Sequence, residues 1–315
     1  MHLTYEGAQF GLTSQQRHTI ARLRQMLPWQ RRKFYKRMSG SHRQIFIYKY
    51  LNFDSADELS VKKVRDILVE SKLYLSAPSD FNDPYDFRAQ IEISRDAASL
   101  RENFQRSARL ALDRGDDAVP HIKGRQRKVE ALASRAMERL RANPHAISDA
   151  FERARERNGV ACFSEDPRGL LMWAHYGAGH TGVCLQFDVT EDPGVLMITH
   201  KVRYREQLPV IEYPIRDTDI VDKVILNKGR AWEAEQEIRY VSLNVVRGSI
   251  PFDSAALRGI ILGARLAKAN LPSLLTMVEE RKERGMREPV LYRAHQDRTC
   301  YGLTIKRFVP VEGIG

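Results

Sequence analysis

Acidic, aromatic and histidine side chains gather in three short segments that lie far apart in the sequence. The longest, residues 161–188, reads ACFSEDPRGLLMWAHYGAGHTGVCLQFD and places ionisable groups between two apolar runs. The others are LYLSAPSDFNDPYDF at residues 73–87 and WEAEQEIRY at residues 232–240. Connections between buried strands need few ionisable groups, and loops held by a rigid sheet often carry function. We therefore predict one composite site built from the three segments.

The third segment carries a pair of carboxylates beside a guanidinium. Glu235, Glu237 and Arg239 occupy alternate positions, and alternate side chains of a strand share one face. Such a pair can stabilise positive charge on a substrate and accept a proton from a nucleophile. The alternative is an exposed, salt-bridged strand face, which is common and contributes little.

The histidines do not have the spacing of a helical metal site. His175 and His180 are five residues apart, whereas two histidines that bind zinc from one helix are four apart. A loop could still bring both to a metal with Asp83 or Glu165. The spacing instead favours one histidine as a general base or as the partner of a carboxylate, and we predict no bound metal.

The second segment has two interpretations. Asn and Asp side chains bond to nearby backbone and proline fixes φ, so FNDPYD is typical of a turn. The same polar groups can also bind the hydroxyls of a ribose. Trp173 and Trp232 have a comparable ambiguity, because large aromatic residues are often core residues.

Composition limits the class of protein. The 315 residues suffice for one large domain or two, and no apolar run has the roughly 18 residues of a membrane helix. The first 16 residues lack the apolar region of a secretory signal. The cysteines Cys162, Cys184 and Cys300 are odd in number and widely spaced, which argues against a disulfide framework or a zinc module and favours a cytoplasmic protein.

Positive charge is concentrated near the N-terminus. The formal net charge is +11, and residues 14–43 contain nine lysines and arginines but no acidic residue. Trp29, Phe34 and Tyr35 are interleaved with them. Arginines with aromatic neighbours can follow a nucleic-acid backbone and stack on bases, so nucleic acid is one predicted partner of this arm. The alternative is a basic helical arm that covers the domain or binds another subunit.

The elements that must position these groups are mixed in type. The pattern of apolar residues predicts helices at 54–71, where Ser55 or Ser60 would cap the first turn, and at 217–230 and 272–285. Residues 95–158 are rich in Ala, Leu, Arg and Glu and are predicted to be a helical insertion. The predicted strands are IFIYKYL, KLYLS, VACFS, GVCLQFDV, MITHKVRY, EIRYVSLNVV, LRGIILG, PVLYRAH and YGLTIKRF.

Helices and strands are therefore mixed without strict alternation, which predicts an α+β fold with a mixed or antiparallel sheet core. We predict a basic helical arm at residues 1–43 and a single domain at 44–315, with the helical insertion at about 95–158. The chain has no GxGxxG and no GxxxxGK[ST] motif, so the sequence gives no support for a phosphate loop or a Rossmann domain.

Four of these motifs together resemble a known bacterial family. They are IYKYLNF, then KLYLSAPSDFNDPYD, then ACFSE with MWAHYGAGHTGVCLQFD, then K-x3-W-x2-E-x-E-x-R over residues 228–239. Their order and spacing resemble the family catalogued as domain of unknown function 2971, from about residue 45 to the C-terminus. That family name carries no function.

The layout is also similar, more distantly, to ADP-ribosyltransferases. Those folds begin with a strand that carries His, Arg or Tyr, followed by a helix and a short strand. A middle strand then supplies Ser or Tyr, and a late strand carries the catalytic Glu, often as E-x-E. Here residues 48–50 (Tyr-Lys-Tyr) match the first place, Ser164 the second and Glu237 the third, while Lys49 stands where Arg or His is usual.

This resemblance implies that NAD is the substrate and that the core is ADP-ribosyltransferase-like. Glu237 would stabilise the oxocarbenium-like state, and Glu235 would orient or deprotonate the acceptor. The implied catalytic set is Glu237, Glu235, Ser164 and His175. The side chains expected around the dinucleotide are Tyr48, Lys49, Tyr50, Asn82, Asp83, Asp86, Trp173, Tyr176, His180, Lys228, Trp232 and Arg239.

Three functional hypotheses remain open from the sequence. The first is an NAD-using ADP-ribosyltransferase-like enzyme that serves as a toxin or as an effector of phage defence. The second is a metal-dependent nuclease or hydrolase, suggested by the carboxylates, the histidines and the basic arm. The third is a non-enzymatic protein that binds nucleic acid or senses a ligand.

Overall fold

The computed structural model describes residues 14–39, 44–114, 122–143, 145–213, 223–243 and 245–310. They form two compact units. Unit 1 draws on the described residues of Met1–Asn82, Arg157–Tyr204 and Arg230–Gly315, and unit 2 on those of Asp83–Glu156 and Arg205–Gly229. The single-domain boundaries predicted from the sequence stay a prediction. In the described part of the chain, no helix is long and apolar enough to cross a membrane.

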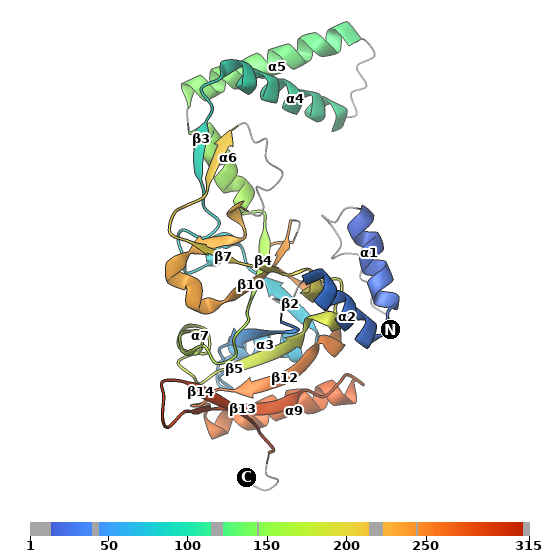
Figure 1. Ribbon diagram of the computed structural model, residues 1–315, viewed down its shortest axis with the longest axis vertical. Helices are drawn as coiled ribbons and strands as arrows, with labels where there is room; N and C mark the ends of the chain where they lie inside the picture. Colours follow the sequence, from blue (N-terminus) through green and yellow to red (C-terminus); the bar gives the residue numbers. More distant parts are fainter. Residues whose placement is uncertain are drawn as a thin grey trace. The chain divides into compact units, whose positions relative to one another are not determined.

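Unit 1 is built on a mixed eight-stranded sheet, which confirms the predicted α+β class (Figure 1). The strand order is β14-β13-β12-β5-β1-β4-β10-β6. Strands β12 and β13 pair in parallel, and the other neighbours pair antiparallel. The strands are β1 (Phe46–Leu51), β4 (Gly159–Ser164), β5 (Val183–Asp188), β6 (His200–Lys201), β10 (Glu237–Ser242), β12 (Leu257–Leu262), β13 (Val290–Gln296) and β14 (Leu303–Arg307).

The two faces of this sheet bury different side chains, because successive residues of a strand point to opposite faces. One face, with Ile47 and Leu185, belongs to the main core, to which helices α3 (Glu58–Leu68) and α9 (Leu271–Glu283) also contribute. The opposite face carries Tyr48 and Tyr50 and packs against α7 (Leu170–His175). The functional side chains therefore have to be assigned to one face or the other.

Helices α3 and α9 overlap the helices predicted at 54–71 and 272–285, and α3 has a different cap from the predicted one. Helix α3 is capped by Asp57, whose carboxylate accepts from the Leu59 amide at 3.0 Å, and not by either predicted serine. Ser60 instead donates to the carbonyl of Asp54 at 2.8 Å. Pro272 lies in the first turn of α9, as predicted. The 3-10 turns are η3 (Pro78–Asp80), η4 (Val189–Glu191), η5 (Leu196–Ile198), η6 (Arg230–Glu235), η7 (Ser254–Ala256) and η8 (Lys268–Asn270).

Several predicted strands are shorter than the sequence suggests. The segment MITHKVRY contains the end of η5, the two-residue strand β6 and the first two residues of β7 (Arg203–Arg205). Strand β10 ends at Ser242. The helix predicted at 217–230 is wrong at its C-terminal end, where residues 227–229 form β9 (Asn227–Gly229), and its residues 217–222 lie outside the described chain. Outside the large sheet, β2 (Lys72–Leu75) pairs with β11 (Gly248–Pro251).

Unit 2 contains the predicted helical insertion. Its helices are α4 (Ala97–Arg114), α5 (Ile122–Ala142) and α6 (Ala146–Arg155). The carboxylate of Glu130 on α5 accepts from Arg101 at 3.0 Å and from Gln105 at 2.6 Å, which joins α5 to α4. Strand β3 (Gln90–Ile93) pairs in parallel with β8 (Val210–Tyr213).

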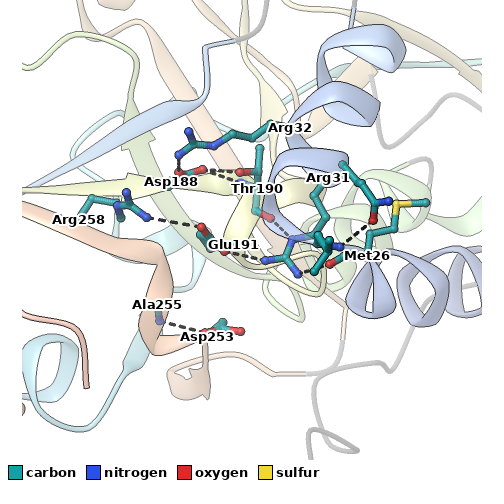
Figure 2. A network of polar contacts seen from close by, with 11 residues as sticks. Met26, Arg31, Arg32, Asp188, Thr190, Glu191, Asp253, Ala255 and Arg258 are labelled. Atoms are coloured by element: carbon teal, nitrogen blue, oxygen red, sulfur yellow. Dashed lines mark hydrogen bonds and ion pairs between the residues drawn. The ribbon is translucent and has the colours of Figure 1, made fainter. Parts of the chain in front are cut away.

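The basic arm is helical and is fixed to unit 1 by its own arginines (Figure 2). Its helices are α1 (Ser14–Gln25) and α2 (Pro28–Ser39). Arg31 donates to Glu191 at 2.6 Å and to the carbonyl of Thr190 at 2.7 Å, and Arg32 pairs with the buried Asp188. Leu23 and Tyr35 are buried in the main core. The described part of the arm therefore covers the domain, as one of the two interpretations of the sequence expected.

Asp192, just after η4, makes stability depend on pH. Its carboxylate is buried and accepts from the amides of Gly194, Val195 and Asp253, each at 3.0 Å. Burial raises its pKa from the ordinary value of 3.8 to about 6. The folded protein therefore binds the Asp192 proton more tightly than the unfolded chain does. The protonated carboxyl group makes its full contribution to the free energy of unfolding below pH 3.8, and this contribution is lost as pH rises through 6.

We expect Asp192→Asn to remove this dependence. Between pH 7 and pH 4.5 the free energy of unfolding of the wild type should gain about 2 kcal/mol relative to the variant. Urea denaturation of both proteins across that range measures the difference, in which titrations common to both cancel. A difference that is constant with pH would contradict the assignment.

Candidate active site

The three strands that carry the predicted motifs are consecutive neighbours in the large sheet. Strand β4 lies between β1 and β10. Tyr48 on β1 pairs with Ser164 on β4, and Ser164 pairs with Glu237 on β10. Directly paired residues share one face of a sheet, so the three side chains form a row across it. Three positions that are far apart in the sequence thus meet at one place.

Glu237 and Arg239 form a buried, two-pronged ion pair on this face. The guanidinium donates to the two carboxylate oxygens of Glu237 at 2.7 and 2.8 Å. Arg239 is 0% exposed, and its guanidinium carbon lies 5.8 Å from the centre of the Phe81 ring. Because paired geometry of this kind strengthens each hydrogen bond, the arginine fixes the orientation of the Glu237 carboxyl group.

Glu235 is not on the strand, which corrects the sequence prediction. It ends η6, and Gln236 has a φ of 44°, so the chain turns sharply before β10 begins at Glu237. Glu235 and Glu237 therefore do not share a strand face by alternation, contrary to the prediction from the sequence. The Glu235 carboxylate instead accepts from the hydroxyl of Tyr176 at 2.7 Å, and Asn82 donates to that hydroxyl at 3.0 Å.

Ser164 joins β4 to the turn before β10. Its hydroxyl donates to the main-chain carbonyl of Glu235 at 2.7 Å and accepts from the amide of Asp166 at 3.1 Å. The amide of Glu165 donates to the carbonyl of Gln236 at 3.0 Å. These bonds place the Glu235 carboxylate, Tyr176 and Asn82 beside the row formed by Tyr48, Ser164 and Glu237.

The predicted aromatic residues lie in an apolar cluster on the same face. Trp173 is 0% exposed and donates from its indole to the carbonyl of Pro167 at 3.0 Å. The Tyr50 ring packs edge-on against the Trp173 ring, with 5.1 Å between the ring centres. The Tyr50 hydroxyl donates to the carbonyl of Asp166 at 2.6 Å. Burial raises the pKa values of Tyr48 and Tyr50. Trp173 and Tyr50 thus have the contacts of core residues that support the site.

Lys49 lies on the other face of the sheet, away from Arg239. Its ammonium donates to the carbonyl of Cys162 at 3.1 Å and lies 5.3 Å from the centre of the Phe163 ring. Burial lowers the pKa of Lys49. Lys49 and Arg239 therefore lie on opposite faces of the sheet, because successive residues of a strand point to opposite faces and Lys49 follows Tyr48, which shares the face of Glu237 and Arg239.

The histidines are separated by the turn that follows α7. His175 ends the helix and is exposed, with its ring centre 6.4 Å from that of Tyr176. His180 has a φ of 71°, and its ring is stacked parallel to that of Trp173, with 6.2 Å between the ring centres. Burial, reinforced by Arg265, lowers the pKa of His180. Glu165 pairs with Lys201, and Trp232 is partly buried in η6.

Three predicted residues belong to unit 2. Asp83 accepts from the amide of Tyr85 at 2.9 Å and so closes the FNDPYD turn, the first of the two interpretations. Asp86 accepts from the amide of Phe87 at 2.9 Å, and the buried ammonium of Lys228 lies 3.8 Å from its other oxygen. These groups form a cluster of their own. Across the described residues, no group of three or more His, Cys, Asp or Glu side chains has the arrangement of a metal site.

Sequence reasoning missed two residues that contact the ion pair. The hydroxyl of Tyr204 accepts from the amide of Glu237 at 2.8 Å, and the ring of Phe81 lies beside Arg239. Tyr204 stands in the poorly predicted MITHKVRY segment and has no motif around it. Phe81 lies within the FNDPYD segment, where the polar residues dominate the interpretation.

Comparison with known proteins identifies part of this region. A family model described as "Protein of unknown function (DUF2971)" matches residues 172–240, which include Tyr176, Glu235, Glu237 and Arg239. No curated protein and no solved structure matches the chain. The matched residues 172–240, which supply both carboxylates of the site, are similar to the DUF2971 family.

Proposed function

We propose that this protein is an NAD-using, ADP-ribosyltransferase-like enzyme. The observation that carries the proposal is the row formed by Tyr48, Ser164 and Glu237 on three adjacent strands. These are the three positions that the ADP-ribosyltransferase layout assigns to its first, middle and late strands. The sequence order alone did not require the strands to be neighbours, so their adjacency is support independent of the motifs.

The side chains suit cleavage of the bond between nicotinamide and ribose. As that bond breaks, positive charge grows on the ribose and nicotinamide departs with the bonding electrons. A fixed carboxylate stabilises this charge, and the ion pair with Arg239 fixes Glu237 in position. The acceptor's oxygen or nitrogen then bonds to the ribose and loses its proton to Glu235, which Tyr176 holds in place. With water as the acceptor, the same steps give ADP-ribose.

The cellular setting belongs to the same proposal. Transfer of ADP-ribose to an essential target suits a toxin or an effector of phage defence. We place its action in the cytoplasm, where free thiols such as those of Cys162, Cys184 and Cys300 stay reduced. A metal-dependent hydrolase is not proposed, because no arrangement of the described side chains favours it.

The test is calorimetric titration of the full chain with NAD, followed by measurement of released nicotinamide. We expect saturable binding and nicotinamide release with turnover. Absence of both would contradict the proposal. Binding without release, in the presence of cell extract as a source of acceptors, would retain the site as a nucleotide sensor and reject the transferase chemistry.

A further inference from the structure

The arm helix α2 has two faces with different partners. Its inner face contains Arg31 and Arg32, which form the ion pairs drawn in Figure 2. Tyr35 lies on the same face and is buried in the main core. Its outer face carries what we call the basic stripe, made up of Trp29, Lys33, Lys36 and Arg37. These residues are separated by four, three and one positions, which places them along one side of a helix. The stripe extends over about 12 Å.

The basic stripe is open to solvent and strongly cationic. Lys33, Lys36 and Arg37 are exposed, and none forms an ion pair with a described residue. Trp29 is 61% exposed. Exposed Arg17, Arg22 and Arg24 on α1 add to the positive charge, and residues 14–39 contain no acidic side chain. On α2, Arg31 and Arg32 pair with Glu191 and Asp188, and both lie on the inner face.

A solvated helix face does not need a large exposed indole beside three cations. The charged groups of lysine and arginine neutralise phosphates, and an aromatic ring offers a stacking surface for a base. We propose that the basic stripe binds single-stranded nucleic acid, with the backbone along Lys33, Lys36 and Arg37 and one base stacked on Trp29. Duplex DNA fits less well, because its bases are already stacked on one another.

The attachment of the arm supports this assignment. Arg31 donates to three acceptors, which are the carboxylate of Glu191 and the carbonyls of Thr190 and Met26. Leu23 and Tyr35 are buried in the main core. A helix held in this way has an outer face that is already ordered, so binding a ligand does not cost the conformational entropy of folding the helix.

The experiment measures anisotropy of a labelled 20-nucleotide oligothymidylate with the full chain at several salt concentrations. The first variant replaces Lys33, Lys36 and Arg37 by alanine, and the second is Trp29→Ala. The matched control replaces the exposed residues Lys63, Lys268 and Lys306 by alanine, which removes the same charge elsewhere on unit 1. Circular dichroism checks that each variant folds.

We expect the stripe variant to bind at least tenfold more weakly and its dependence on log salt to become shallower by about two. Trp29→Ala should weaken binding by roughly 5- to 100-fold at unchanged salt slope. The control should stay within about threefold of the wild type. Equal losses in the stripe variant and the control would overturn the proposal, as would no binding by the wild type.

Two further binding measurements distinguish other classes of partner. Binding to vesicles of phosphatidylcholine with 30% phosphatidylserine but not to the oligonucleotide would identify a lipid surface and reject the proposal. Tighter binding to a 20-base-pair duplex than to the single strand would reject the stacking role of Trp29. The stripe residues are not among the candidate active site residues named above, so the nicotinamide release assay tests the proposed function separately from this result.

Discussion

Glu237→Gln is expected to slow nicotinamide release at least about 100-fold. The neutral amide keeps the shape of the side chain but cannot stabilise positive charge on the ribose. In other enzymes, loss of one such electrostatic interaction lowers the rate by roughly 100- to 1,000-fold. The measurement is single-turnover release of nicotinamide from NAD at saturating enzyme, beside the wild type. A variant that retains more than half of the wild-type rate would exclude Glu237 from the chemistry.

Loss of stability is the main confounding effect of this substitution. Arg239 is fully buried against Glu237, and removing one member of a buried pair costs about 3–5 kcal/mol when the other charge is left alone. The double variant Glu237→Gln/Arg239→Met removes both charges and should recover much of that loss. Release should remain slow in the double variant, which separates chemistry from folding.

A second control tests whether any glutamate of this region would give the same result. Glu233 stands in η6, two residues before Glu235, and is exposed, with an ion pair to Arg230 at 3.4 Å. Glu233→Gln removes the same charge from the same segment. We expect its rate to stay within about twofold of the wild type, since exposed pairs contribute little.

Arg281→Leu is expected to lower the free energy of unfolding by about 4 kcal/mol. Arg281 is 0% exposed on α9 and donates to the carbonyls of Leu68 at 2.7 Å, Arg287 at 2.7 Å and Ser254. The guanidinium thus joins α9 to the end of α3 and to η7, and burial lowers its pKa to about 10. Leucine would leave three carbonyls without this donor, at about 1–3 kcal/mol for each that water cannot reach.

Urea denaturation of the variant beside the wild type measures this loss. Arg281→Lys should recover only part of it, because one ammonium cannot reach three diverging carbonyls in place of a planar guanidinium. Lys282→Leu is the matched control on the next position of the helix, where the side chain is exposed, and should change stability by less than about 0.5 kcal/mol. A change below 1 kcal/mol for Arg281→Leu would show that water or other groups replace the guanidinium.

Local pattern was sufficient for most of the elements and insufficient for the arrangement of the site. Apolar periodicity located β1, β5, β12 and α9, because alternation and helical spacing are properties of the chain itself. It misplaced the region around Glu235, where a positive φ at Gln236 ends a 3-10 turn. A glutamine has no strong sequence signal for that backbone conformation.

The sequence by itself determined the class of the fold, the helical character of the arm and the family motifs, because each depends on residue types at short separations. It also determined that Glu237 and Arg239 share a face, since both lie in one strand. Only the tertiary structure decided that β1, β4 and β10 are neighbours, that Lys49 and Arg239 lie on opposite faces of the sheet, and that Arg31 and Arg32 point inward while Lys33 points outward. Strand order and the burial of charges depend on contacts between residues more than a hundred positions apart, such as Arg31 with Glu191, and no local pattern encodes those partners.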